Sequence, residues 1–221
     1  MPVYRLSEEI VFPHPSNAVS GGLLAVGGDL SPERLLLAYA MGIFPWYTTD
    51  EPILWWSPDP RLVLFPEELH VSKSLARVIR KNVFDVTVNR AFRRVIEACA
   101  AVRTGVGEGT WITEDMIDAY ARLHELGYAH SIESWHAGEL AGGLYGIALG
   151  QAFFGESMFS VKTDASKVAF VHLVEIARRL NLRFIDCQTT TEHLKRFGAR
   201  EIPRSEFLLF LDEAMRKGRQ P

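Results

Sequence analysis

The chain has 221 residues, of which 48% are hydrophobic, 11% aromatic and 23% charged, and its mass is 24.9 kDa. This composition is that of an ordinary globular protein, and it excludes a disordered chain, collagen and a coiled coil. The formal net charge is only -3, but residues 70–94 hold seven Lys or Arg residues and one acidic residue, Asp85.

Residues 1–60 are rich in Pro, Gly and Trp, and they contain one evident helix. Ser31 is expected to be its N-cap, Pro32 its first residue and Gly42 its end. We expect this region to form a small N-terminal α+β subdomain, followed by a linker at the prolines of SPDPR.

Residues 61–221 alternate between helical and extended patterns, and we expect them to form a second domain. The predicted helices cover residues 72–81, 90–102, 113–126, 165–180, 192–197 and 205–216. The predicted strands cover residues 62–65, 84–89, 130–136, 141–159 with a turn at Gly150 and Gln151, and 182–188. The fourth helix carries an apolar stripe from Ala165 to Leu180. The fold class is therefore α+β, with a mixed, mostly antiparallel sheet flanked by helices.

Several kinds of chemistry find no support in the sequence. The segment from Gly155 to Phe159 lacks the second glycine of a nucleophile elbow, and the histidines have no metal-ligand spacing. Cys99 and Cys187 lie in apolar segments without a CxxC pair, so we expect them to be packed in a reducing compartment. We predict no metal and no cofactor, and neither an export signal nor a membrane span.

A basic helix is one candidate site. Lys73, Arg77, Arg80 and Lys81 are spaced so that all four project from one helix face. They could bind the phosphates of a nucleic acid, or they could form an ordinary solvated surface.

Aromatic and polar residues provide further candidates. Trp46 and Trp111 lie in loop-like segments where an indole could stack on a nucleobase, although most tryptophans simply belong to the core. Glu156 interrupts the apolar segment FFGESMF, and Asp186 and Gln188 alternate around Cys187, which should place both on one side of a strand. These polar groups could form a structural hydrogen-bonded pair or line a pocket for a cationic or amide-bearing substrate.

Long, ordered motifs between about Phe12 and Leu211 resemble those of the leucyl/phenylalanyl-tRNA-protein transferases of bacteria. The motifs are LLAVGGDLSPERLLLAYAMGIFPW, ILWWSPDPR, GTWIT, AYARLHELGYAHSIE, GGLYGIALG, FFGESMFS, ASKVAF and FIDCQ. The resemblance implies an N-acetyltransferase-like fold for residues 61–221. It also implies transfer of Leu, Phe or sometimes Met from aminoacyl-tRNA to proteins that begin with Arg or Lys, which creates an N-degron for the N-end rule pathway. The expected enzyme is a cytoplasmic monomer.

The resemblance also implies roles for individual residues. Asp186 would orient Gln188, whose carbonyl would accept a hydrogen bond from the attacking amine, while Glu156 would recognise the basic acceptor. Trp46 and Trp111 would hold the terminal adenosine. The aminoacyl side chain would enter an apolar pocket that includes Leu144, Phe153, Met158 and Ile185, and the basic helix would grip the acceptor stem through Lys73, Arg77, Arg80 and Lys81.

Three questions stay open at this stage. The proton of the amine could pass to the ribose hydroxyl of the substrate or to Asp186. An acyl-CoA-dependent N-acyltransferase is an alternative enzyme, although no pyrophosphate-binding loop is found in the sequence. A non-catalytic module that binds tRNA or a degron is the other alternative.

Overall fold

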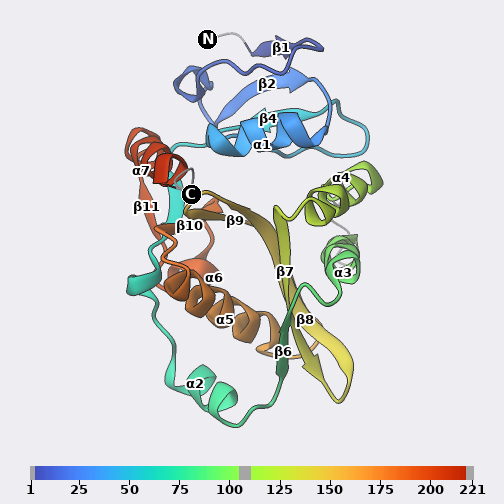
Figure 1. Ribbon diagram of the computed structural model, residues 1–221, viewed down its shortest axis with the longest axis vertical. Helices are drawn as coiled ribbons and strands as arrows, with labels where there is room; N and C mark the ends of the chain where they lie inside the picture. The colour runs from blue at the N-terminus through green and yellow to red at the C-terminus, as the bar shows by residue number, and fades with distance from the viewer. Residues whose placement is uncertain (1–2, 105–110, 218–221) are drawn as a thin grey trace.

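The computed structural model describes residues 3–104 and 111–217. Its N-terminal part is a four-stranded sheet in the order β1-β2-β4-β3, at the top of Figure 1, with helix α1 (Pro32–Ala40) packed against it. Its strands are β1 (Tyr4–Leu6), β2 (Leu23–Gly27), β3 (Phe44–Pro45) and β4 (Leu54–Trp56). Only β1 and β2 pair in parallel.

The second sheet has seven strands in the order β11-β5-β10-β9-β8-β7-β6. The strands are β5 (Arg61–Leu64), β6 (Asp85–Val88), β7 (Ala129–His136), β8 (Glu139–Leu149), β9 (Ala152–Ser160), β10 (Phe184–Gln188) and β11 (Arg200–Ile202). Only β9 and β10 run in parallel; the other neighbours are antiparallel. The predicted α+β class with a mixed, mostly antiparallel sheet is confirmed.

Helices cover both faces of the large sheet (Figure 1). They are α2 (Lys73–Arg80), α3 (Phe92–Thr104), α4 (Glu114–Glu125), α5 (Ala165–Arg179), α6 (Glu192–Lys195) and α7 (Arg204–Lys217), with short 3-10 helices at Pro15–Asn17 and Pro66–Glu68. One core lies under α2 and α5, whereas the other continues from α3, α4 and α7 into the N-terminal sheet. Because that core is shared, the proposed domain boundary near residue 60 stays a prediction.

The structure corrects three details of the sequence interpretation. The N-terminal strands and β11, which have two to five residues each, were not predicted. The side chain of Ser31 does not cap α1; instead, Asp29 accepts a hydrogen bond from the Ser31 amide at 2.8 Å. Leu180 follows the end of α5 and is 63% exposed, while Phe170 and Val174, which lie outside the predicted stripe, are buried. Helix α5 packs against the sheet and also contacts α2, so its buried surface is wider than one stripe.

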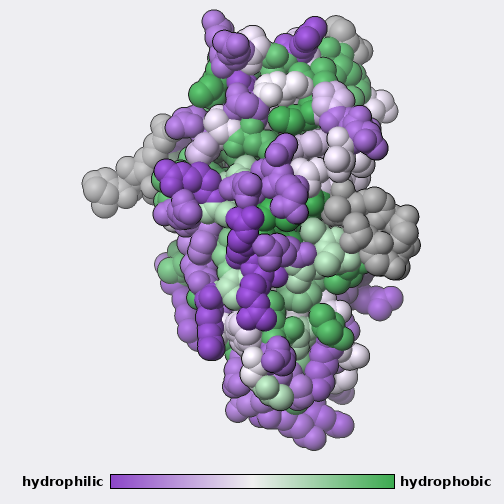
Figure 2. Space-filling model, turned by 90° about the vertical axis from the view of Figure 1, so that its right-hand side faces the viewer, coloured by the Kyte–Doolittle hydropathy of each residue, from purple (hydrophilic) through white to green (hydrophobic). Residues whose placement is uncertain are grey.

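The molecular surface is mixed. On the face shown in Figure 2, hydrophilic side chains predominate, and hydrophobic ones come to the surface around its middle. Within residues 3–104 and 111–217, no helix has the length and apolar character needed to cross a membrane. The predicted glycine-rich loop 104–110 lies, apart from Thr104, outside the described residues.

Candidate active site

The end of strand β10 is irregular, and this irregularity shapes the site. The pairing register with β5 shifts between Asp186 and Gln188, and Gln188 has a left-handed φ of 61°. A non-glycine residue adopts this conformation only where its surroundings hold it. Here the Asp186 carboxylate accepts a hydrogen bond from the Gln188 backbone amide at 2.9 Å. Asp186 therefore holds the main chain of Gln188 through this contact.

Asp186 is itself held by Arg61, a residue that sequence analysis did not select. The Arg61 Nε and Nη2 atoms donate to the two Asp186 carboxylate oxygens at 2.9 and 2.6 Å, and Arg61 and Asp186 are 1% and 0% exposed. Arg61 Nη1 also donates to the Gly42 carbonyl at 3.2 Å. The guanidinium lies over the rings of Phe44 and Phe207, 4.9 and 4.6 Å from their centroids. The only sequence signal was an arginine at the start of an apolar strand.

Glu156 connects the end of β10 to a buried tyrosine pair. The Gln188 side-chain amide donates to Glu156 Oε1 at 2.8 Å, and the Tyr120 hydroxyl donates to Glu156 Oε2 at 3.2 Å. The Tyr120 hydroxyl also forms a hydrogen bond with the Tyr39 hydroxyl. Burial is the main cause that raises the pKa of Glu156 to about 7, opposed by hydrogen bonds from Tyr39, Tyr120 and Gln188. Glu156 thus changes charge in the physiological pH range.

The orientation of the Gln188 amide follows from this contact. When Glu156 is ionised its carboxylate can only accept hydrogen bonds, so the Gln188 nitrogen faces it in that form. The carbonyl oxygen of Gln188 then points elsewhere, and within the described part of the chain no donor is bound to it. Gln188 therefore offers a hydrogen-bond acceptor to a bound molecule.

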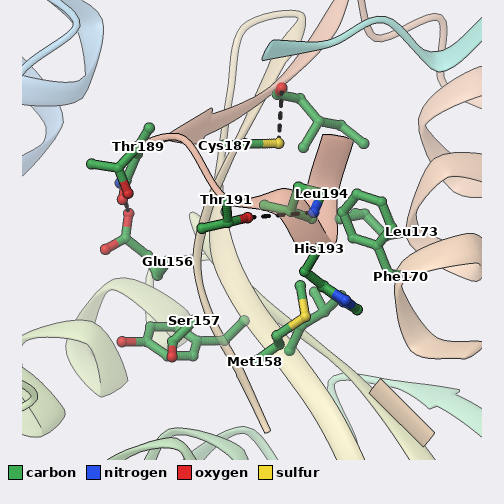
Figure 3. A pocket seen from close by; sticks show the side chains of 15 residues that line it. Glu156, Ser157, Met158, Phe170, Leu173, Cys187, Thr189, Thr191, His193 and Leu194 are labelled. Atoms are coloured by element: carbon green, nitrogen blue, oxygen red, sulfur yellow. Dashed lines mark hydrogen bonds between the residues drawn. The ribbon is translucent and has the colours of Figure 1, made fainter. Parts of the chain in front are cut away.

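An apolar cavity of about 230 Å³ opens beside these polar groups. Three of the four residues predicted for an apolar pocket line it, namely Leu144, Met158 and Ile185. Phe153 does not line the cavity; it is 3% exposed and packs in the core beneath it. Residues that the sequence analysis missed complete the lining, among them Phe170, Leu173, His193 and Leu194 (Figure 3).

A second cavity, of about 100 Å³, adjoins the first. The predicted residues Trp46 and Trp111 line it together with Phe44 and Pro45. Glu156, Gln188 and Thr189 border both cavities. The polar groups thus stand where an aromatic-lined cavity meets an apolar one, an arrangement suited to a ligand with a flat ring at one end and an apolar group at the other.

The predicted basic helix forms as α2. Ser72 caps it by accepting a hydrogen bond from the Leu75 amide at 3.3 Å, and Lys81 is its C-cap. Lys73, Arg77, Arg80 and Lys81 are all exposed. Within the described residues, none of the four takes part in an ion pair. No cluster of three His, Cys, Asp or Glu side chains in residues 3–104 and 111–217 could hold a metal ion.

Comparison with known proteins gives consistent results. The family model "Leucyl/phenylalanyl-tRNA protein transferase" matches residues 63–212, and the model of that family's N-terminal domain matches residues 28–59. A leucyl/phenylalanyl-tRNA-protein transferase of Syntrophobacter fumaroxidans is 65% identical, with 96% of this chain and 91% of the relative aligned. One from Anaeromyxobacter sp. (strain Fw109-5) is 64% identical, over 97% of this chain and 92% of the relative.

Solved structures are more distant. An aminoglycoside acetyltransferase from an uncultured soil metagenomic sample aligns with 49% of this chain and 82% of its own, at 18% identity and a TM-score of 0.34.

Proposed function

This chain belongs to the leucyl/phenylalanyl-tRNA-protein transferase family and is an aminoacyl-tRNA-dependent transferase, and we propose how its two cavities and the Glu156–Gln188 pair perform the reaction. The donor is an aminoacyl ester of the terminal ribose. The acceptor is the N-terminal amine of a protein that begins with Arg or Lys. Leu and Phe are the main transferred residues, and Met is transferred less well.

The donor occupies both cavities. Trp46 and Trp111 hold the terminal adenine by stacking in the aromatic-lined cavity. The aminoacyl side chain fills the apolar cavity of about 230 Å³. The scissile ester then lies between the two, beside Gln188. One methylene more or fewer in such a pocket changes binding by about 1–3 kcal/mol, so the enzyme favours Leu and Phe but does not exclude Met.

Peptide-bond formation requires a positioned amine more than a strong base. An α-amino group has a pKa of about 8, so a useful neutral fraction exists at neutral pH. Its nitrogen attacks the ester carbonyl, the carbon–nitrogen bond forms, and the carbon–oxygen bond to the ribose breaks. The Gln188 carbonyl accepts a hydrogen bond from the attacking amine and aligns it.

The proton of the amine passes to the departing ribose oxygen. Asp186 is a poor candidate for a base, because it is 0% exposed and both of its oxygens already accept hydrogen bonds from Arg61. Asp186 is instead a positioning residue that acts through the Gln188 main chain.

Glu156 recognises the acceptor. Its carboxylate borders both cavities and accepts a hydrogen bond from the Gln188 side chain. An N-terminal Arg or Lys brings a side-chain cation and an ammonium, either of which pairs with this carboxylate. The product carries Leu or Phe at its N-terminus and serves as an N-degron. We expect the enzyme to act as a monomer in the cytoplasm, where aminoacyl-tRNA is made.

One observation supports this proposal above the others: Gln188 and Glu156 sit where an indole-lined cavity meets an apolar cavity. The test is transfer of labelled Leu or Phe from aminoacyl-tRNA to peptides that begin with Arg, Lys or Ala, without added metal or CoA. Transfer to the Arg and Lys peptides alone is expected. Binding of aminoacyl-tRNA without transfer would favour a non-catalytic module, and activity only with acyl-CoA would favour an N-acyltransferase.

A further inference from the structure

A third cavity adjoins the apolar pocket at His193, away from Glu156, and its lining is basic. Its volume is about 210 Å³. The lining residues are His70, Ser72, Leu75, Lys167, His193, Arg196 and Phe197. Two of these side chains are permanent cations, two are imidazoles, and none is acidic. A cavity with this lining attracts an anion.

The cations of this cavity keep hydrogen-bond donors for a ligand. Arg196 is exposed and, among the described residues, takes part in no ion pair. Lys167 forms an ion pair with Asp164 at 2.7 Å, which offsets part of its charge, but an ammonium has three donors and two remain. The pKa of His193 is lowered by burial and by the nearby charges of Lys167 and Arg196, which places all three groups in one region of positive potential.

The position of the cavity indicates which anion it meets. His193 lines both this cavity and the apolar pocket, and in Figure 3 it lies at the opposite end of that pocket from Glu156. On its other side, the cavity is bordered by Ser72, the N-cap of α2, and by Leu75 within that helix. The basic cavity thus lies between the apolar pocket and the basic helix.

The proposed function creates a need for a contact at this place. If the terminal adenosine lies in the cavity of Trp46 and Trp111 and the acceptor stem lies on α2, the basic cavity stands beside the course of the single strand that joins them, next to the pocket that holds the aminoacyl side chain. Single strands are held by positively charged grooves that follow their phosphates.

We infer that Lys167 and Arg196, with His70 and His193, form a binding site for a phosphate of the single-stranded 3′ end of aminoacyl-tRNA. This inference rests on the proposed function and extends it, because it adds a contact between the stem and the reacting end. The site holds the strand by charge and does not read a base.

The experiment compares Lys167→Ala and Arg196→Ala with Arg179→Ala, a matched control that removes an exposed cation from the end of α5, away from this cavity. Binding of Phe-tRNA is measured over a series of salt concentrations, and transfer to an Arg peptide is measured with Phe-tRNA and with phenylalanyl-adenosine, which has no phosphate. Each cavity variant should raise the Kd for Phe-tRNA about three- to tenfold and should lower the salt slope by about 0.7. Transfer from phenylalanyl-adenosine should equal that of the unsubstituted enzyme, and the control should change nothing.

Three results would overturn the inference. Unchanged Kd and salt slope would show that no phosphate is bound there. An equal loss with phenylalanyl-adenosine would mean that the variants act on the apolar pocket through His193. A rise confined to the KM of the Arg peptide, with an unchanged Kd for Phe-tRNA, would assign the cavity to the acceptor. Failure of the unsubstituted enzyme to transfer from either donor would refute the proposed function, whereas the binding data would still decide the phosphate site.

Discussion

Arg61 provides the sharpest test of how the site is held together. In Arg61→Met the carboxylate of Asp186 loses both of its charge-assisted hydrogen bonds and stays buried, and the Gly42 carbonyl loses its donor. Breaking a buried ion pair by removing one partner costs about 3–5 kcal/mol of folding stability. Arg61→Lys keeps the charge but cannot form the bidentate contact with the Asp186 carboxylate. It should therefore lose one charge-assisted hydrogen bond and about 1.5–3 kcal/mol of folding stability.

Activity should fall through kcat and not through KM. Without Arg61, Asp186 is free to turn, and the Gln188 amide loses the acceptor that holds it at its left-handed φ. A misplacement of the reacting groups by about 1 Å can cost about a hundredfold in rate. We therefore expect Arg61→Met to lower kcat by about a hundredfold and to leave the KM for Phe-tRNA within about threefold, because Arg61 lines neither donor cavity.

The assays are urea unfolding followed by tryptophan fluorescence, and steady-state transfer of labelled Phe to an Arg peptide. The double variant Arg61→Met, Asp186→Asn is the control for folding. The amide side chain that replaces the carboxylate is uncharged yet can still accept from the Gln188 amide, so the double variant should regain stability and part of kcat. A folded Arg61→Met variant with normal kcat would refute the positioning role, as would a loss seen only in donor KM.

Three further predictions test other parts of the site. Glu156→Gln keeps an oxygen for the Gln188 amide but removes the charge. Because the pKa of Glu156 is about 7, its carboxylate is lost as pH falls below that value. We therefore expect log kcat/KM for Arg peptides, plotted against pH, to approach a slope of about 2 below pH 7 in the unsubstituted enzyme, because both Glu156 and the amine of the peptide take up a proton. In the variant only the amine does so, and the slope should be about 1. Equal slopes would contradict the acceptor role. Leu144→Ala enlarges the apolar cavity and should raise the Phe-to-Leu ratio of kcat/KM about tenfold, whereas Phe153→Leu, outside the lining, should lower stability and leave the ratio unchanged. Arg77→Ala should weaken Phe-tRNA binding and reduce the slope of log K against log salt concentration by about 0.9. Unchanged affinity and slope would mean that α2 is an ordinary solvated surface.

Local chemistry determined the elements that the sequence predicted well. Ser72 and Thr113 cap their helices by accepting from the Leu75 and Met116 amides, and these contacts join residues only three positions apart. The long segment 141–159 alternates apolar residues around a glycine-containing turn, and it forms the antiparallel pair of β8 and β9. Such patterns can be recognised in a sequence because the residues that interact are close together along the chain.

The candidate site was predicted in part, and mostly through resemblance to a family. Trp46 and Trp111 share one cavity, and Leu144, Met158 and Ile185 share another, which no spacing in the sequence could show. Composition and periodicity had left Glu156, Asp186 and Gln188 as polar residues of undecided role, because burial alone fits a structural pair as well as a pocket.

The tertiary structure alone decided how those polar groups are held. The contact between Arg61 and Asp186 joins residues 125 positions apart, and that between Glu156 and Gln188 joins residues 32 apart. Tyr39 and Tyr120 meet across 81 positions. A buried charge must find a partner, and the sequence requires that one exist, but the identity of the partner depends on which strands and helices pack side by side. Packing also places the left-handed turn at Gln188, where strand periodicity predicts an ordinary extended residue.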